Sequence, residues 1–226
     1  MKTLILGIGN LLWADEGFGV RCVERMAQRY RFDESVELMD GGTQGIYLIH
    51  NVEEADNLIV FDAVDYGLAP GTIKVVEDDE VPKFMGAKKV SLHQTGFQEV
   101  LATVMLKGSY PQRLVLIGVQ PEEIEDYGGS LRPVVKAQID PCVEIALDYL
   151  KRWGIEPVEE LEDKRDCIIG SEALALDRYE AEQPQDRDLW AKGDPRVLLD
   201  EDVRFEPKKV LQESDMSVCL HQQRVK

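Results

Sequence analysis

Apolar residues recur along the chain with two periods, and this pattern predicts an α/β fold. Short apolar runs bounded by turn residues are typical of strands, whereas apolar residues three and four apart indicate helices. Helical stretches separate most of the runs, so we expect a three-layer αβα fold with a mostly parallel, twisted sheet of about five strands. The predicted strands are 3–8 (TLILGI), 36–39 (VELM), 58–62 (LIVFD), 72–77 (TIKVVE) and 114–119 (LVLIGV).

The run 72–77 alternates between apolar and polar residues more than the others, which favours an edge or antiparallel position. Three apolar stripes at helical spacing are predicted to pack on the sheet as core. Their members are Val20, Val23, Met26, Ala27 and Tyr30; Val100, Leu101, Val104 and Met105; and Val143, Ala146, Leu147 and Leu150.

A change in composition follows Gly154. Charged residues make up 30 of the 72 residues after this point, against 39 of the 154 before it, and four prolines interrupt the later stretch. We therefore predict an α/β domain over residues 1–154 and an acidic, loosely structured extension over 155–226. Only SEALALDRYEAE (171–182) and LLDEDVRF (198–205) look able to order locally.

The net charge of −17 and the pI near 4.6 argue against a nucleic-acid ligand, because the chain would repel phosphates. No apolar run approaches the roughly 20 residues of a membrane span, so membrane insertion is not expected. The scattered cysteines, which form no CxxC pair, favour neither a zinc knuckle nor a disulfide framework and fit a reducing cytoplasm. They are Cys22, Cys142, Cys167 and Cys219.

Polar residues stand where an open α/β sheet binds ligands, beyond the carboxyl ends of its strands. Asp15 and Glu16 follow the first strand, DGGTQG (40–45) follows the second, and Asp62 ends the third. His93 precedes a further helix in the sequence SLHQ. If the first and third strands are neighbours, Glu16, Asp62 and His93 arrive at one edge of the sheet.

Two carboxylates and an imidazole around one point would form a divalent-metal site with open positions, and this mixed set suits nickel, zinc or manganese. Each residue also has an ordinary structural explanation. Asp15 is expected to cap a helix that begins near Gly17, DGGTQG can be a simple turn, and His93 can bond a backbone carbonyl. An ionised Asp62 beside an apolar run is harder to explain without a partner or a cation.

Six motifs in order along the chain resemble those of the maturation endopeptidases of nickel–iron hydrogenases. They are LLWADEGFGV, DGGTQG, LIVFDAVDYG, SLHQ, LIGVQP and DYGGSL, and the similarity covers residues 3–154. The sequences LLWADEGFGV and DYGGSL are most similar to those of the branch that serves membrane-bound uptake hydrogenases.

This resemblance implies a cytoplasmic, aspartic-type endopeptidase that removes the C-terminal peptide of the hydrogenase large-subunit precursor after nickel insertion. Glu16, Asp62 and His93 would be the metal-binding residues, and the nickel would be carried by the precursor rather than held as a permanent cofactor. Asp40, Gly41, Gly42 and Thr43 match a loop associated with substrate recognition. The catalytic group beyond Glu16, Asp62 and His93 stays unassigned.

Two other functions remain open at this point. One is an assembly chaperone that inspects nickel without cleavage, because the sequence shows no convincing serine or cysteine nucleophile and no HExxH motif. The other is a nucleotide-dependent enzyme, because Gly7 and Gly9 follow the first strand, although the third glycine of the dinucleotide fingerprint is missing.

Overall fold

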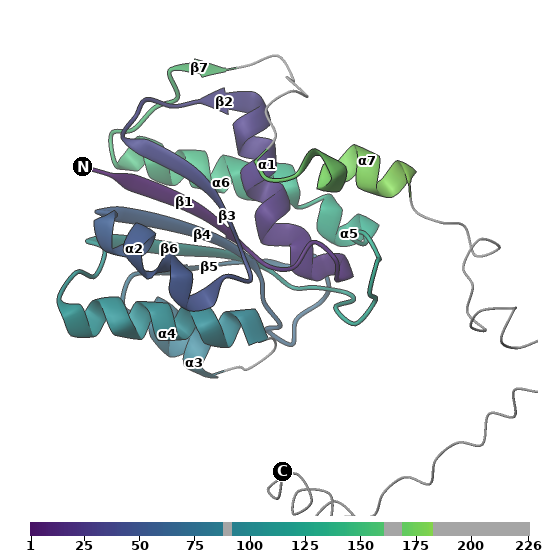
Figure 1. Cartoon of the computed structure of the whole chain (residues 1–226), viewed down its shortest axis with the longest axis horizontal. Helices are drawn as coiled ribbons and strands as arrows, with labels where there is room; N and C mark the ends of the chain where they lie inside the picture. The colour runs from purple at the N-terminus through teal and green to yellow at the C-terminus, as the bar shows by residue number, and fades with distance from the viewer. Residues whose placement is uncertain (88–91, 161–168, 183–226) are drawn as a thin grey trace, which may run out of the picture. The chain divides into compact units, whose positions relative to one another are not determined.

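The computed structural model describes residues 1–87, 92–160 and 169–182, without the side chains of residues 84–95 and 160. A five-stranded sheet in the order β3-β1-β4-β6-β5 forms its centre (Figure 1). Four strands are parallel, and β5 pairs antiparallel with β6 at the edge, which confirms the prediction for the run 72–77. The strands are β1 (Thr3–Ile8), β3 (Val36–Gly42), β4 (Asn57–Ala63), β5 (Ile73–Glu77) and β6 (Arg113–Val119).

Helices cover both faces of the sheet, which confirms the three-layer αβα fold (Figure 1). One face carries α1 (Phe18–Arg29) and α6 (Ile139–Arg152), and the other carries α2 (Ile49–Glu54), α3 (Glu80–Ala87) and α4 (Leu92–Lys107). Side chains alternate between the faces along each strand. On β4, Ile59 and Phe61 join the core under α1 and α6, whereas Leu58 and Val60 join the core under α2–α4.

The three predicted helical stripes correspond to α1, α4 and α6, with two differences. Tyr30 is buried but begins the short strand β2 (Tyr30–Arg31), because the backbone becomes extended after Arg29. Met105 is 52% exposed rather than core, because it lies in the last turn of α4, where Leu106 is also exposed.

Part of the predicted extension packs against the domain. Strand β7 (Glu159–Glu160) pairs antiparallel with β2, and Ile155 and Ile169 contact the core under α1 and α6. The segment SEALALDRYEAE forms a turn of 3-10 helix, η3 (Glu172–Leu174), and helix α7 (Leu176–Ala181), which confirms its predicted local order. The segment LLDEDVRF and the predicted loose structure of residues 161–168 and 183–226 lie outside the described residues.

Helix α1 lies close against the carboxyl ends of β1 and β4 because Gly19 has no side chain. A Cβ atom at Gly19 would collide with the carbonyl oxygens of Phe61 and Ile8. Gly9, at φ 139°, approaches the 3-10 turn η1 (Ala14–Gly17) in the same way, because a Cβ there would collide with the carbonyl oxygen of Glu16. These approaches fix η1 beside the ends of the central strands.

Two expectations about the cellular setting concern thiols and membranes. Cys22 and Cys142 are buried free cysteines, while Cys167 and Cys219 lie outside the described residues. Among the helices that the structure describes, none has the length and apolar character needed to span a bilayer.

Candidate functional site

Four loops meet at the carboxyl edge of the sheet, because β1, β3, β4 and β6 run parallel. Strands β1 and β4 are direct neighbours, which is the condition that the predicted grouping of Glu16 and Asp62 required. In Figure 1 the arrowheads of these strands converge on the side where η1 and the start of α4 lie.

Asp62 is fully buried at the end of β4, where it pairs in register with Gly118 of β6. Strand alternation places it on the same face as Leu58 and Val60, under α2–α4. The hydroxyl of Tyr66 lies over the neighbouring strand, since a Cβ at Gly118 would collide with it. Burial, and then the negative charge of Asp62, raises the pKa of Tyr66. A neutral phenol therefore stands beside the buried carboxylate.

Glu16 lies in η1 and is partly exposed, whereas its neighbours in the turn are buried. The contact of η1 with Gly9 places its backbone at the end of β1, the strand adjacent to β4. Glu16 and Asp62 therefore reach the same edge of the sheet from adjacent strands.

His93 belongs to the first turn of α4, and its side chain lies outside the described residues. One turn further, a Cβ at Gly96 would lie 3.2 Å from the Cα of Gly45, so the start of α4 lies beside the loop after β3. This position is at the carboxyl edge and on the face that holds Asp62. The described side chains, which exclude His93, contain no group of three His, Cys, Asp or Glu residues able to hold a metal ion. The three-residue metal site stays a prediction.

Asp15 does not cap a helix, and the expectation that it would was wrong. Neither η1 nor α1 has a side-chain cap, and Asp15 is fully buried. Its Oδ2 accepts hydrogen bonds from the backbone N–H groups of Glu122 (2.8 Å) and Glu123 (2.9 Å), and its Oδ1 accepts one from Arg132 (2.7 Å). The carboxylate therefore holds the loop after β6. The N–H groups that it binds come from this loop, and not from the start of a helix as expected.

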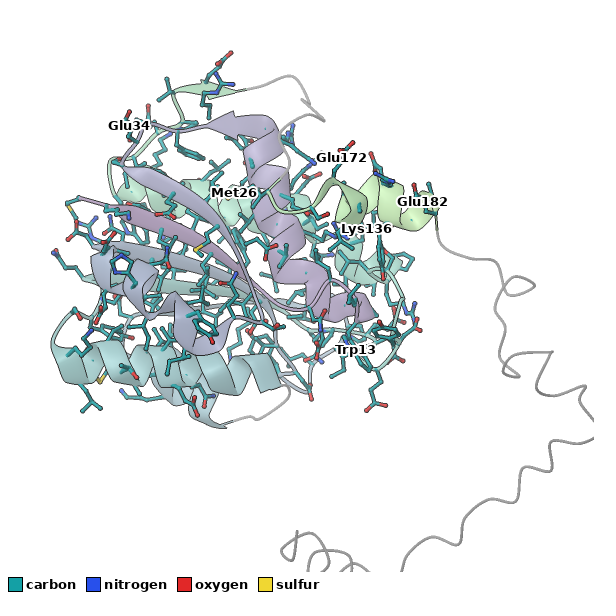
Figure 2. All side chains as sticks on the ribbon, viewed as in Figure 1. Trp13, Met26, Glu34, Lys136, Glu172 and Glu182 are labelled. Atoms are coloured by element: carbon teal, nitrogen blue, oxygen red, sulfur yellow. The ribbon has the colours of Figure 1, made fainter. Side chains whose placement is uncertain are left out.

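The loop between β6 and α5 (Pro133–Lys136), residues 120–132 and here called the β6–α5 loop, is also joined to the loop after β1 by backbone and ring contacts. The N–H of Gly128 donates to the carbonyl of Leu12 at 2.7 Å. Trp13 and Tyr127 form a β-bridge, and their rings meet edge to face at 5.3 Å. Figure 2 shows Trp13 at this margin of the sheet, below α5. The two loops form one structural unit next to Glu16.

Gln120 has a structural role that the sequence analysis did not assign. This nearly buried side chain accepts hydrogen bonds from the N–H groups of Tyr66 (2.7 Å) and Leu68 (3.1 Å) and donates to Asp65 Oδ1 (2.9 Å). It thus fixes the loop after β4, which carries Tyr66 to Asp62. The available signal was a polar residue directly after the apolar strand LVLIGV, the same signal that singled out Asp62.

Asp40 lies on the other face of the sheet from Asp62. It points to the same face as Val36 and Leu38, four and two residues earlier in the strand, which pack in the core under α1 and α6. Burial raises its pKa, while the Gly42 amide and the charge of Arg21 on α1 oppose that effect. Gly41 is buried, and Gly42 and Thr43 are progressively more exposed. Of the predicted substrate loop, Thr43 is therefore the residue most open to a ligand.

Exposed apolar side chains follow each of the four parallel strands. Such side chains are common singly, but several on converging loops indicate a protein-binding surface. Those on the loops at the carboxyl edge are Leu12 (37% exposed), Ile46 (60%), Tyr47 (81%), Leu68 (47%) and Tyr127 (68%).

Comparison with known proteins identifies the family. The model of the hydrogenase maturation protease family, HycI, matches residues 20–149. The chain belongs to this family. It is accordingly an endopeptidase, and this assignment favours peptide hydrolysis over the nucleotide-dependent alternative.

Two relatives of this chain support both its assignment to the family and the predicted branch. The hydrogenase expression/formation protein HoxM of Azotobacter vinelandii is 58% identical over 212 residues, which cover 94% of this chain and 98% of HoxM. The hydrogenase 2 maturation protease of Escherichia coli K12 is 42% identical over 159 residues, 70% of this chain and 96% of that protein. The higher identity to HoxM supports the branch predicted from LLWADEGFGV and DYGGSL.

A solved structure of the family has the same fold. The hydrogenase maturating endopeptidase HybD from E. coli superimposes with a TM-score of 0.68 at 40% sequence identity, over 73% of this chain and all of that one. The α/β fold predicted from the apolar pattern is therefore that of the hydrogenase maturation proteases.

Proposed function

We propose that this protein removes the C-terminal peptide from the large-subunit precursor of a nickel–iron hydrogenase, and that it recognises nickel carried by that precursor. The observation that carries the proposal is the fully buried carboxylate of Asp62 at the carboxyl edge of the sheet. The turn that carries Glu16 and the first turn of α4, which carries His93, lie at the same edge.

The chemistry of these residues suits a cation that arrives with the substrate. A buried carboxylate is costly in a low-dielectric environment unless it is paired, so a bound divalent ion lowers that cost. Carboxylate oxygens and an imidazole nitrogen are suitable nickel ligands. Each tenfold preference for loaded over empty precursor requires about 1.4 kcal/mol, which one added metal ligand can supply.

Peptide hydrolysis at this edge needs a group that accepts a proton from water and a group that stabilises charge on the carbonyl oxygen. In the aspartic-type reaction that we propose, a carboxylate of the site takes the proton, and the nickel of the precursor polarises the scissile carbonyl or the water. The neutral hydroxyl of Tyr66 beside Asp62 is a further donor at the site.

A protein substrate is supported by the apolar side chains on the four loops of this edge. A folded precursor can dock on them while its C-terminal segment enters beside Asp62. Free thiols at Cys22 and Cys142 fit the cytoplasm, where we propose that this reaction takes place.

The test is incubation of the protein with nickel-loaded and nickel-free precursor, with the mass of the precursor as the readout. We expect loss of the C-terminal peptide from the loaded form alone, and loss of processing in Glu16→Gln, Asp62→Asn and His93→Ala. Glu144→Gln, at an exposed position of α6, is the matched control and should process normally. Equal cleavage of both precursors would refute nickel recognition, and a stable complex without a mass change would favour the chaperone instead.

A further inference from the structure

Residues 169–182 run along α1 between two loops of the carboxyl edge, and we call this segment the brace. At its beginning, a Cβ at Gly170 would lie 3.4 Å from Oδ2 of Asp40, at the end of β3. At its end, Glu180 of α7 contacts Ser130 and Lys136 on the β6–α5 loop and α5. The family model ends at residue 149, so it does not describe the brace.

The centre of the brace is anchored on a buried ion pair of α1. Arg21 and Glu24 are 3% and 6% exposed, and Nη1 of Arg21 donates to Oε2 of Glu24 at 2.8 Å. The same Nη1 donates to the carbonyl of Leu174 at 2.6 Å, and the guanidinium lies 5.8 Å from the ring centre of Tyr179. A buried guanidinium requires several acceptors, and the brace supplies one of them.

The end of the brace is anchored by the carboxylate of Glu180. Its Oε1 accepts from the Ser130 hydroxyl (2.8 Å) and from Lys136 Nζ (2.8 Å), and Nζ also donates to Oε2 (2.7 Å). Figure 2 shows Lys136 directly below the ribbon of α7. Burial of the carboxyl raises the pKa of Glu180, but the hydrogen bonds from Lys136 and Ser130 outweigh burial and leave the pKa below its usual value.

A continuous set of contacts leads from Glu180 to Glu16. Ser130 is two residues from Arg132, whose N–H donates to Asp15, and Asp15 is the sequence neighbour of Glu16 in η1. The three N–H groups that bond Asp15 all belong to the β6–α5 loop. A movement of this loop therefore acts directly on the turn that presents Glu16.

We propose that the brace holds the β6–α5 loop against η1, and that Glu180 is a positioning residue for the protease reaction. This inference rests on the proposed function, because it assigns the loop a place beside the reacting peptide. The alternative is that this acidic segment only increases solubility. That alternative does not explain why Leu174 and Glu180 of the segment accept hydrogen bonds from Arg21 and Ser130. Misplacement of a reacting group by about 1 Å is enough to lower a rate substantially.

The experiment compares Glu180→Ala with Glu182→Gln in the full chain. Glu182 directly follows α7, two residues after Glu180, and its carboxylate pairs with Arg178 of the same segment at 2.8 Å, so it is the matched control. Hydrogen exchange of the Glu122, Glu123 and Arg132 amides reports the loop itself. We expect about tenfold faster exchange and about tenfold lower kcat/KM on nickel-loaded precursor for Glu180→Ala, with a decrease in Tm of no more than about 4 °C, and no change for Glu182→Gln.

Rescue tests the ion pair. The double variant Lys136→Glu/Glu180→Lys reverses the pair and should recover exchange protection and processing relative to Glu180→Ala; no recovery would refute the pair as the link. Unchanged exchange in Glu180→Ala would overturn the brace. Faster exchange with wild-type processing would overturn the positioning role. If the wild-type protein leaves the precursor intact, the proposed function fails, while the exchange data still decide whether the brace holds the loop.

Discussion

Replacing Asp15 by asparagine tests whether this carboxylate holds the β6–α5 loop. Asp15 is fully buried and accepts three backbone hydrogen bonds of 2.7–2.9 Å. Asparagine has the same shape but only one acceptor oxygen, and its NH2 group must face a backbone N–H. The variant therefore loses at least one bond to a charged acceptor and leaves a donor unsatisfied.

The expected cost follows from these bonds. A hydrogen bond to a charged group contributes about 1.5–3 kcal/mol, and an unsatisfied buried donor costs about 1–3 kcal/mol. Because one oxygen of the wild-type carboxylate is retained as the amide oxygen, we count a single lost bond and expect Asp15→Asn to lower the free energy of unfolding by at least about 2.5 kcal/mol. For a chain of this size, that corresponds to a decrease in Tm of at least about 5 °C.

Urea unfolding followed by tryptophan fluorescence measures this change, since Trp13 lies at the same loop. The control is Glu16→Gln, because Glu16 is partly exposed and surface substitutions usually change stability by no more than about 0.5 kcal/mol. The two adjacent carboxylates should thus differ in effect: substitution of Asp15 should lower stability, and substitution of Glu16 should lower processing. A urea midpoint of Asp15→Asn equal to that of the wild type would refute the assignment of Asp15 as the loop anchor.

Three further predictions concern α1 and the brace. Gly19→Ala should cost about 3 kcal/mol or more, because its Cβ meets two strand carbonyls, whereas Gly154→Ala, with open space and φ 79°, should cost about 1–2 kcal/mol in denaturant titrations; equal costs would contradict this. Arg21→Met should cost about 3 kcal/mol by leaving Glu24 unpaired, and adding Glu24→Met should recover most of it; no recovery would count against the buried pair. The lowered pKa of Glu180 means that its stabilisation is present above pH 4.5 and is lost as the pH falls below that value. The stability difference between wild type and Glu180→Gln should therefore shrink on acidification, and a constant difference would argue against it.

The strands were predictable because their signal is local. A buried parallel strand is a nearly continuous apolar run, so the predicted run 3–8 coincides with β1, and 114–119 differs from β6 by one residue. The run 72–77 has a mixed pattern because one side of an edge strand is less covered, and β5 is the antiparallel edge. The short pair β2 and β7 was missed because two residues in each strand carry no periodicity.

The environment of Asp15 was not predictable from the pattern around it. Its partners are 107, 108 and 117 residues away in sequence, and a backbone N–H is present at almost every position. A local reading therefore assigned the nearest available donors, those of the helix start. The same limit applies to the brace. The local order of SEALALDRYEAE was predicted, but its packing against Arg21 and Ser130 was not, because these contacts join residues 153 and 50 positions apart in sequence.

Strand alternation gives Asp40 and Asp62 different environments, although both lie near the carboxyl ends of strands in one sheet. Asp62 points to the same face as Leu58 and Val60, which is the face covered by α4, where the turn containing His93 lies. Asp40 faces α1 and adjoins Gly170 of the brace. The two carboxylates therefore lie on opposite faces of the sheet. Burial raises the pKa of Asp40, and the Gly42 amide and the charge of Arg21 oppose this only in part. We therefore expect a substitution at Asp40 to act through the packing of α1 and the brace, and one at Asp62 to act on the nickel site that we propose.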